Sequence, residues 1–145
     1  MIEDAAHIQF LTIPRAELKI SLKRNSSPKE LQFFGNRPGL LSLAHVLHWL
    51  DFNSHRREIL AASELPFVKT KLRFFFRLVT DLKPEEFGTI HRRKKEWEWC
   101  FCEDQVRRIT RVVNQIAFWI EHEYWKIGVS EFEIHFRMID VRSWL

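Results

Sequence analysis

The sequence contains only two cysteines and four glycines in 145 residues, and none of the common catalytic signatures occurs in it. There is no glycine-rich phosphate loop, no serine nucleophile elbow and no His-Glu-x-x-His helix. Cys100 and Cys102 stand too close together for an unstrained disulfide, so free thiols in a reducing compartment are expected. These absences predict a protein that is not an enzyme and needs neither a cofactor nor a metal.

Signals for export and for membrane insertion are also missing. The first residues, Met1-Ile2-Glu3-Asp4, have neither the basic start nor the apolar core of a signal peptide. No apolar run approaches the ~20 residues that span a bilayer. A cytoplasmic protein without a membrane partner is therefore expected, and the length and the lack of a linker-like stretch predict a single domain over residues 1–145.

What the sequence does contain is a repeated pattern. A strand, an amphipathic helix and an aromatic strand ending in Phe-Arg and two apolar residues occur in residues 29–80 and again in residues 95–141. In the aromatic strands, residues 72–79 and 132–139, apolar and mostly polar side chains alternate, which is typical of a strand with one face in the core. The repetition predicts an internal duplication of a strand-helix-strand unit.

The two helices are indicated by apolar residues at spacings of three and four over Leu40–Leu50 and Val106–Ile120. Asn36 and Asp104 are the expected N-caps, and Gly128 is expected to lie beyond the end of the second helix. Each helix therefore presents a single apolar stripe to the core.

Further strands are predicted from polar–apolar alternation and from turn residues. Residues 17–23 alternate without a break, and residues 8–13 are interpreted as their hairpin partner. A second hairpin is predicted over residues 88–93 and 96–101, with Trp97 on its apolar face. Together these elements predict an α+β fold, in which one largely antiparallel sheet carries both helices on one face.

If the two aromatic strands belong to one sheet, their outward side chains share its open face. These side chains are Arg73, Phe75, Arg77, Glu133, His135 and Arg137. Charged groups around an aromatic residue can supply both an anchor and selectivity for a partner protein. We therefore predict that this face binds a protein, with an outer face that only contacts solvent as the alternative.

The main functional alternative is a nucleic-acid-binding protein, because a compact basic run lies at the tip of the second hairpin. This run, His91–Lys95, is followed directly by aromatic residues, a combination that suits single-stranded nucleic acids. Its candidate phosphate-binding residues are Arg92, Arg93, Lys94 and Lys95. The arginines of the second helix are expected about 25 Å away, at the other end of a strand. A tip that is only solvated is therefore favoured, and nucleic acid is expected to bind weakly.

Histidines, carboxylates and thiols offer further candidate sites, for which an ordinary structural role is favoured. His45, His48 and His55 could ligate a metal, but no cysteine or carboxylate completes a recognised spacing. Glu96 and Glu98 share a strand face, yet basic residues on neighbouring strands would neutralise them as ordinary cross-strand partners. A cysteine nucleophile needs a histidine within hydrogen-bond reach, and the sequence specifies none.

One stretch resembles a known kind of protein. The residues Leu31-Gln32-Phe33-Phe34-Gly35-Asn36-Arg37-Pro38-Gly39-Leu40-Leu41-Ser42-Leu43-Ala44, continuing to Leu47 and Leu50, are similar to the immunity-protein families of bacterial polymorphic toxin systems. In those sequences a strand ends in Gly-Asn and Gly-Leu opens a helix. The resemblance implies a cytoplasmic binding protein that neutralises a cognate toxin by covering its active surface. Because this chain is basic, a basic nuclease is disfavoured as the target.

Overall fold

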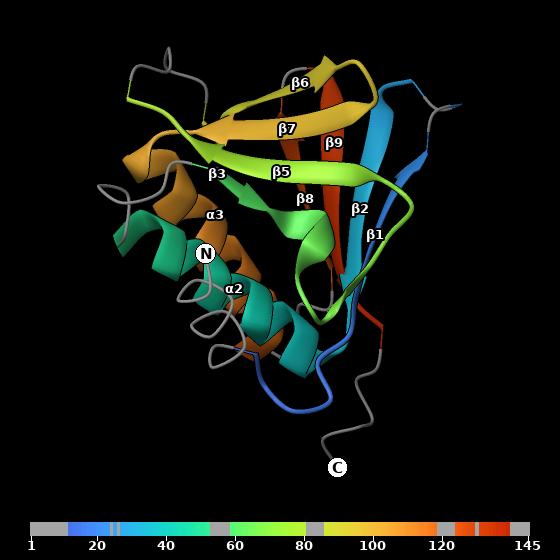
Figure 1. The fold of residues 1–145 in the computed structure, drawn as a ribbon. Coiled ribbons are helices and arrows are strands. Elements are labelled where there is room, and N and C mark those ends of the chain that lie inside the picture. The colour runs from blue at the N-terminus through green and yellow to red at the C-terminus, as the bar shows by residue number, and fades with distance from the viewer. Residues whose placement is uncertain are drawn as a thin grey trace.

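Two sheets and two helices make up the part of the chain that the computed structural model describes, namely residues 12–23, 25, 27–52, 59–80, 86–118, 124–129 and 131–139 (Figure 1). The five-stranded sheet has the strand order β4 (Val68–Lys69), β1 (Leu18–Lys23), β2 (Lys29–Gly35), β9 (Phe132–Met138) and β8 (Tyr124–Val129). The four-stranded sheet has the order β3 (Ile59–Ala61), β5 (Arg73–Leu78), β7 (Glu96–Phe101) and β6 (Thr89–Arg93). The helices are α2 (Arg37–Phe52) and α3 (Glu103–Phe118), and a short 3₁₀ helix, η1, covers Ala62–Glu64.

The α+β class predicted from the sequence is confirmed, but the prediction of one largely antiparallel sheet is wrong. Both sheets are mixed, because β2 pairs in parallel with β9, and β5 pairs in parallel with β7. Alternation along the sequence shows that each aromatic strand has one apolar face, but it does not show which strand lies beside it. Packing two sheets face to face lets these large apolar faces bury one another as well as the helices.

The order of elements is similar in the two halves of the chain, although η1 and β4, between β3 and β5, have no counterpart among the described elements of the second half. β1, β2 and α2 are followed by β3 and β5, just as β6, β7 and α3 are followed by β8 and β9. In each half the last strand pairs with the hairpin of the other half. The two exchanged strands end alike, because the Ile139 N–H donates to the Gly35 carbonyl and the Val79 N–H donates to the Phe101 carbonyl, both at 2.9 Å.

An aromatic cluster joins the two sheets at the centre of the core. The Phe33 ring of β2 stacks on Phe136 of β9 at 5.3 Å between centroids and meets the edge of Phe74 of β5 at 5.8 Å. Trp99 of β7 touches the same cluster, 5.9 Å from Phe33. The apolar strand faces were predicted correctly, since the inward side chains are buried: Phe74, Phe76, Trp97, Trp99, Phe101, Phe132, Ile134, Phe136 and Met138.

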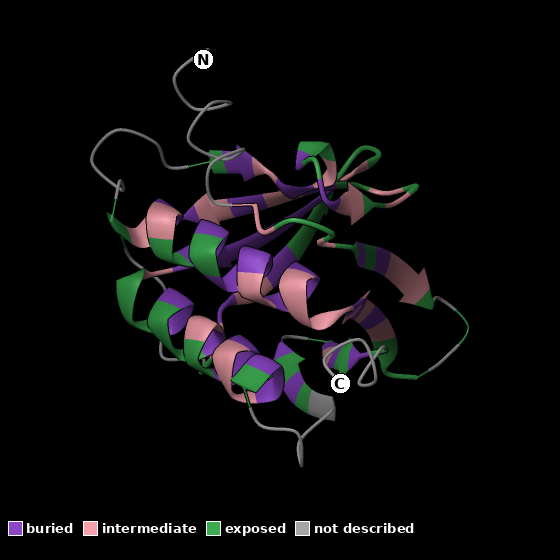
Figure 2. Cartoon of the chain, turned by 90° about the horizontal axis from the view of Figure 1, so that it is seen from below, coloured by how far each residue is buried: buried purple, intermediate pink, exposed green. Residues whose placement is uncertain are grey.

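Both amphipathic helices form where the apolar spacing predicts them, except that Ile120, the last residue of the second predicted stripe, lies outside the described residues. Their stripes are buried, with Leu40, Leu43, Leu47 and Leu50 in α2, and Val106, Ile109, Val113 and Ile116 in α3. The helices lie side by side, with α2 against β2, and α3 against β7, β8 and β9. Figure 2 shows the buried positions on the side of the helices that faces the sheets. One helical layer therefore contacts both sheets.

The predicted N-cap of α2 is confirmed, whereas the start of α3 differs from the prediction. Asn36 caps α2, because its Oδ1 accepts a hydrogen bond from the Gly39 N–H at 2.8 Å. In α3 the helix already includes Asp104, and the Gln105 side chain instead accepts the Cys102 N–H at 2.8 Å. Gly128 does not follow the helix directly but lies within β8.

The N-terminal hairpin was not predicted correctly where it can be compared. Residues 8–11 of its first expected strand lie outside the described residues, and Thr12 and Ile13 are not in a strand. β1 pairs with β2 in antiparallel and with β4 in parallel orientation. The strands β3 and β4 contain only three and two residues, too few for alternation to show.

In the described part of the chain, neither helix is long and apolar enough to cross a membrane.

Candidate functional site

The predicted partner-binding residues lie on two separate surfaces. Arg73, Phe75 and Arg77 are on the outer face of the four-stranded sheet, and Glu133, His135 and Arg137 are on the outer face of the five-stranded sheet. Because the sheets pack with their inner faces together, these outer faces point away from each other. The prediction of one shared surface is therefore wrong, and each group has to be considered alone.

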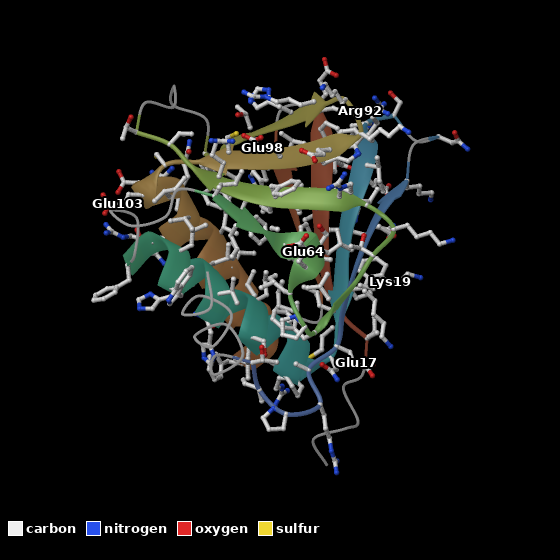
Figure 3. All side chains as sticks on the ribbon, viewed as in Figure 1. Glu17, Lys19, Glu64, Arg92, Glu98 and Glu103 are labelled. Atoms are coloured by element: carbon white, nitrogen blue, oxygen red, sulfur yellow. The ribbon has the colours of Figure 1, made fainter. Side chains whose placement is uncertain are left out.

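On the four-stranded sheet, ion pairs flank a half-buried aromatic ring. Phe75 lies between Ala61 of β3 and Glu98 of β7 in the strand register. On one side of it, Arg73 Nη2 lies 3.7 Å from Glu96 Oε1. On the other side, Arg77 Nε donates to the nearly buried Glu98 carboxylate, which Figure 3 labels. Arginines of β5 therefore neutralise both carboxylates, as ordinary cross-strand partners do.

Burial and the neighbouring Glu98 carboxylate make the Cys100 thiol a weak acid. Burial would raise the pKa of Glu98, but hydrogen bonds from Arg77 and Cys100 and the charge of Arg77 outweigh it and lower that pKa. Burial, together with the Glu98 carboxylate 3.4 Å from its Sγ, raises the pKa of Cys100 to about 11. The thiol is therefore protonated at neutral pH and is a poor nucleophile.

On the five-stranded sheet, a chain of polar contacts crosses several strands. Lys126 Nζ of β8 lies 3.2 Å from Glu133 Oε2, and this contact lowers the pKa of Glu133. Glu133 lies directly opposite Glu30 of β2 in the strand register, and His135 lies close to both carboxylates. The Arg137 guanidinium stands 5.6 Å over the Phe34 ring, so that arginine is held on the sheet surface.

The basic hairpin tip is exposed, as the sequence predicts, and other cations lie near it. Arg92, Arg93, Lys94 and Lys95 are all exposed at the turn between β6 and β7. Arg92 lies 5.5 Å over the Trp97 ring, which meets Phe132 edge-on at 5.6 Å. Lys29 Nζ stands 5.9 Å over the same Phe132 ring, so the first residue of β2 adds a cation to this end. Figure 3 shows Arg92 well apart from Glu103, the first residue of α3.

The helix pair carries the histidines considered as metal ligands. His45 and His48 are exposed on α2, and His55 lies outside the described residues. A shallow groove of about 390 Å³ between the helices is lined by His48, Asp51 and Arg107, among others. Arg107 Nε lies 3.2 Å from Asp51 Oδ2, so this carboxylate is already in an ion pair. Within the described residues, the one set of three side chains able to share a metal is elsewhere, at Glu30, Glu133 and His135.

Sequence reasoning missed Glu30 as a neighbour of Glu133 and His135. The Glu-x-His spacing places Glu133 and His135 on one strand face, which periodicity indicates, but the pairing of β2 with β9 is a contact between distant segments. Comparisons of this chain with protein-family models, with curated proteins and with solved structures found no match. The chemistry of its surfaces is therefore the basis for a functional assignment.

Proposed function

We propose that this protein is a non-catalytic, cytoplasmic protein-binding module of the immunity-protein type. It binds an acidic surface of its partner, a toxin, with the outer face of the four-stranded sheet. The observation that carries this proposal is the half-buried Phe75 ring held between the Arg73–Glu96 and Arg77–Glu98 pairs. An aromatic side chain in a frame of ordered charges is the kind of anchor that dominates protein interfaces.

The charge of this face supports an acidic partner. Both of its carboxylates, Glu96 and Glu98, are paired with arginines of β5. Beyond them β6 contributes the exposed Arg93, and the adjoining turn contributes Lys94 and Lys95. The face therefore carries an excess of positive charge that would speed the approach of an acidic protein and select it over a basic one.

The proposal that the protein is not an enzyme is supported by the state of its most buried thiol. Cys100, with its pKa raised to about 11, cannot act as a thiolate nucleophile near neutral pH. The resemblance of Leu31–Leu50 to immunity proteins supports the same proposal, because such proteins act by covering a toxin and not by chemistry.

Replacing Phe75 by alanine is expected to weaken partner binding by about 2 kcal/mol or more, roughly thirtyfold, because the ring is the anchor of the proposed interface. The probe is the protein encoded directly upstream of this chain, since immunity proteins normally follow their toxins. Calorimetric titration gives the dissociation constant. The matched control is Phe34→Ala, the same change on the outer face of the other sheet, which should leave affinity unchanged.

Thermal melting of both variants separates lost binding from lost folding. The proposal would be wrong if Phe75→Ala binds the upstream protein as tightly as the wild type does. A loss confined to Phe34→Ala would move the interface to the five-stranded sheet, and a loss in neither variant would move it to the segment 53–65 or off the sheets altogether.

Nucleic-acid binding is a second candidate, because Lys29 lies near the basic hairpin tip. Lys29 stands over the Phe132 ring, Phe132 contacts Trp97, and Arg92 of the tip stands over the Trp97 ring. Four or five phosphate contacts imply a salt slope of about −4, so modest affinity at low salt should nearly vanish at physiological salt. Titrating labelled single-stranded RNA and duplex DNA at two salt concentrations measures this. If submicromolar affinity persists at physiological salt and is lost when residues 92–95 become glutamates, nucleic acid is the better candidate.

We also propose that the chain contains the internal duplication predicted from its sequence. Its support is the similar order of elements, with η1 and β4 as additions to the first half, and the equal length of α2 and α3, which contain 16 residues each. The exchange of last strands between the halves is what two copies of one swapped unit would give when fused into one chain.

A further inference from the structure

Two glutamates face each other across the centre of the five-stranded sheet. Glu30 of β2 and Glu133 of β9 are direct partners in the parallel register, where like charges destabilise a sheet. At the corresponding parallel junction of the four-stranded sheet, Glu96 is the partner of an arginine, Arg73. The like-charge pair is therefore a particular feature of this surface, and a positive group between the two carboxylates would relieve it.

His135 brings a third donor atom to the same point. Its Nε2 lies 3.6 Å from Glu133 Oε1 and 3.9 Å from Glu30 Oε1. One possible ligand atom from each of the three residues lies within 4.8 Å of the other two. These separations are longer than a hydrogen bond. They are close to the ~3.4 Å that separates two ligand atoms of a tetrahedral metal ion with bonds of about 2.1 Å.

The second oxygen of each carboxylate is held by a different neighbour. Gln32 Nε2 donates to Glu30 Oε2 at 3.4 Å, and Lys126 Nζ lies 3.2 Å from Glu133 Oε2. The Ser21 hydroxyl in turn donates to Gln32 Oε1 at 3.1 Å, which fixes the amide. Such outer contacts turn the Oε1 atoms of both glutamates toward His135 and resemble the partners that orient metal ligands.

We infer that Glu30, Glu133 and His135 form a binding site for Zn²⁺, with water completing the coordination. A set of one imidazole and two carboxylates suits zinc, which accepts nitrogen and oxygen ligands in tetrahedral sites. The side chains of His135, Glu30 and Glu133 are 12%, 22% and 27% exposed, so an ion can reach the site while most of the coordinating groups are shielded from water.

The surrounding charges permit a divalent cation. Lys126 is a basic group in contact with a proposed ligand, Glu133, and its single charge is outweighed by the two carboxylates. In the absence of metal, the His135 ring itself lies beside both glutamates, and this is the arrangement that the experiment has to distinguish from a zinc site.

The test is titration of Zn²⁺ into the tag-free full-length protein by calorimetry, with the visible absorption of Co²⁺ as a second readout. We expect saturable binding of one ion per chain and a tetrahedral Co²⁺ spectrum. Glu30→Gln, Glu133→Gln and His135→Asn should each weaken binding by more than about tenfold, since even the loss of a group outside the ligand set typically costs that much. Zinc should also raise the melting temperature of the wild type and not of His135→Asn.

Two control variants cover the other candidate ligands. Glu96→Gln changes a glutamate at the corresponding junction of the other sheet, and His48→Asn removes an exposed helix histidine. Both should bind zinc like the wild type. The inference is overturned if the wild type binds no stoichiometric zinc, if His48→Asn is the variant that loses binding, or if the three site variants all retain it. Because the glutamine variants keep the shape of the side chains, they remain informative if His135→Asn fails to fold.

Discussion

Replacing Phe33 by alanine should lower the free energy of unfolding by about 3–5 kcal/mol, the usual cost of deleting a fully buried aromatic ring. Phe33 is 0% exposed, and its ring touches Phe136 in its own sheet and both Phe74 and Trp99 in the other. The cavity would therefore open between the two sheets, where several rings would lose a neighbour at once. Chemical denaturation followed by tryptophan fluorescence measures the change.

The control for this prediction is the next residue. Phe34→Ala removes the same number of atoms from the outer face, where the ring contacts the Arg137 guanidinium, and should cost about 1 kcal/mol or less. Phe74→Ala and Phe136→Ala should match Phe33→Ala, whereas Arg73→Ala should stay within about 1 kcal/mol. Equal losses at Phe33 and Phe34 would mean that the inner and outer faces of β2 are assigned the wrong way round.

These strand faces could be predicted from the sequence because they depend only on neighbouring residues. Alternation placed Phe74, Trp97 and Phe136 in the core, and spacings of three and four placed the stripes of both helices, all of which the structure confirms. The position of the α2 cap at Asn36 is local in the same sense.

The arrangement of the strands could not be predicted in this way. Which strand lies next to β2 is decided by residues about a hundred positions away, and an apolar face is satisfied equally well by another sheet or by a helix. Because a single sheet was predicted, a single outer face was predicted as well, and that face does not exist. Phe75 and His135, expected to be neighbours, ended on different sheets, while Glu30 and His135, which no local pattern connects, came together.

The stretch that resembles immunity proteins has a structural role. Gly35, Asn36 and Gly39 form the junction of β2 with α2 and lie against the backbone of Glu17, just before β1. Asn36 accepts hydrogen bonds from the N–H groups of Gly39 and Glu17 and donates to the Arg15 carbonyl at 2.8 Å. The residues that carry the resemblance therefore have a role in the fold of this chain, and that role does not depend on any partner. In α3 the position corresponding to Gly39 is Gln105, so the second half caps its helix by another route.

Replacing Gly39 by alanine is expected to be the most disruptive of the small substitutions, with a loss of about 3 kcal/mol from overpacking. A Cβ atom at this position would lie 2.1 Å from the carbonyl oxygen and 2.7 Å from the carbonyl carbon of Glu17. Both atoms belong to the backbone, so no side chain can rotate away. The start of α2 and the segment before β1 would have to separate, which would also break the hydrogen bonds that Asn36 makes between them.

The matched control is Gly128→Ala in β8, where a Cβ atom would meet nothing within 4 Å. This change should leave stability unchanged or raise it by up to about 1 kcal/mol, because alanine reduces the freedom of the unfolded chain. Urea denaturation of both variants gives the two free energies of unfolding on the same scale. Alanine is a better helix former than glycine, so helix propensity alone would stabilise the Gly39→Ala variant and cannot explain the predicted loss. A Gly39→Ala protein as stable as Gly128→Ala would show that the contact between α2 and Glu17 is looser than the structure describes, and that the Gly-Asn and Gly-Leu pairs are not required for the junction.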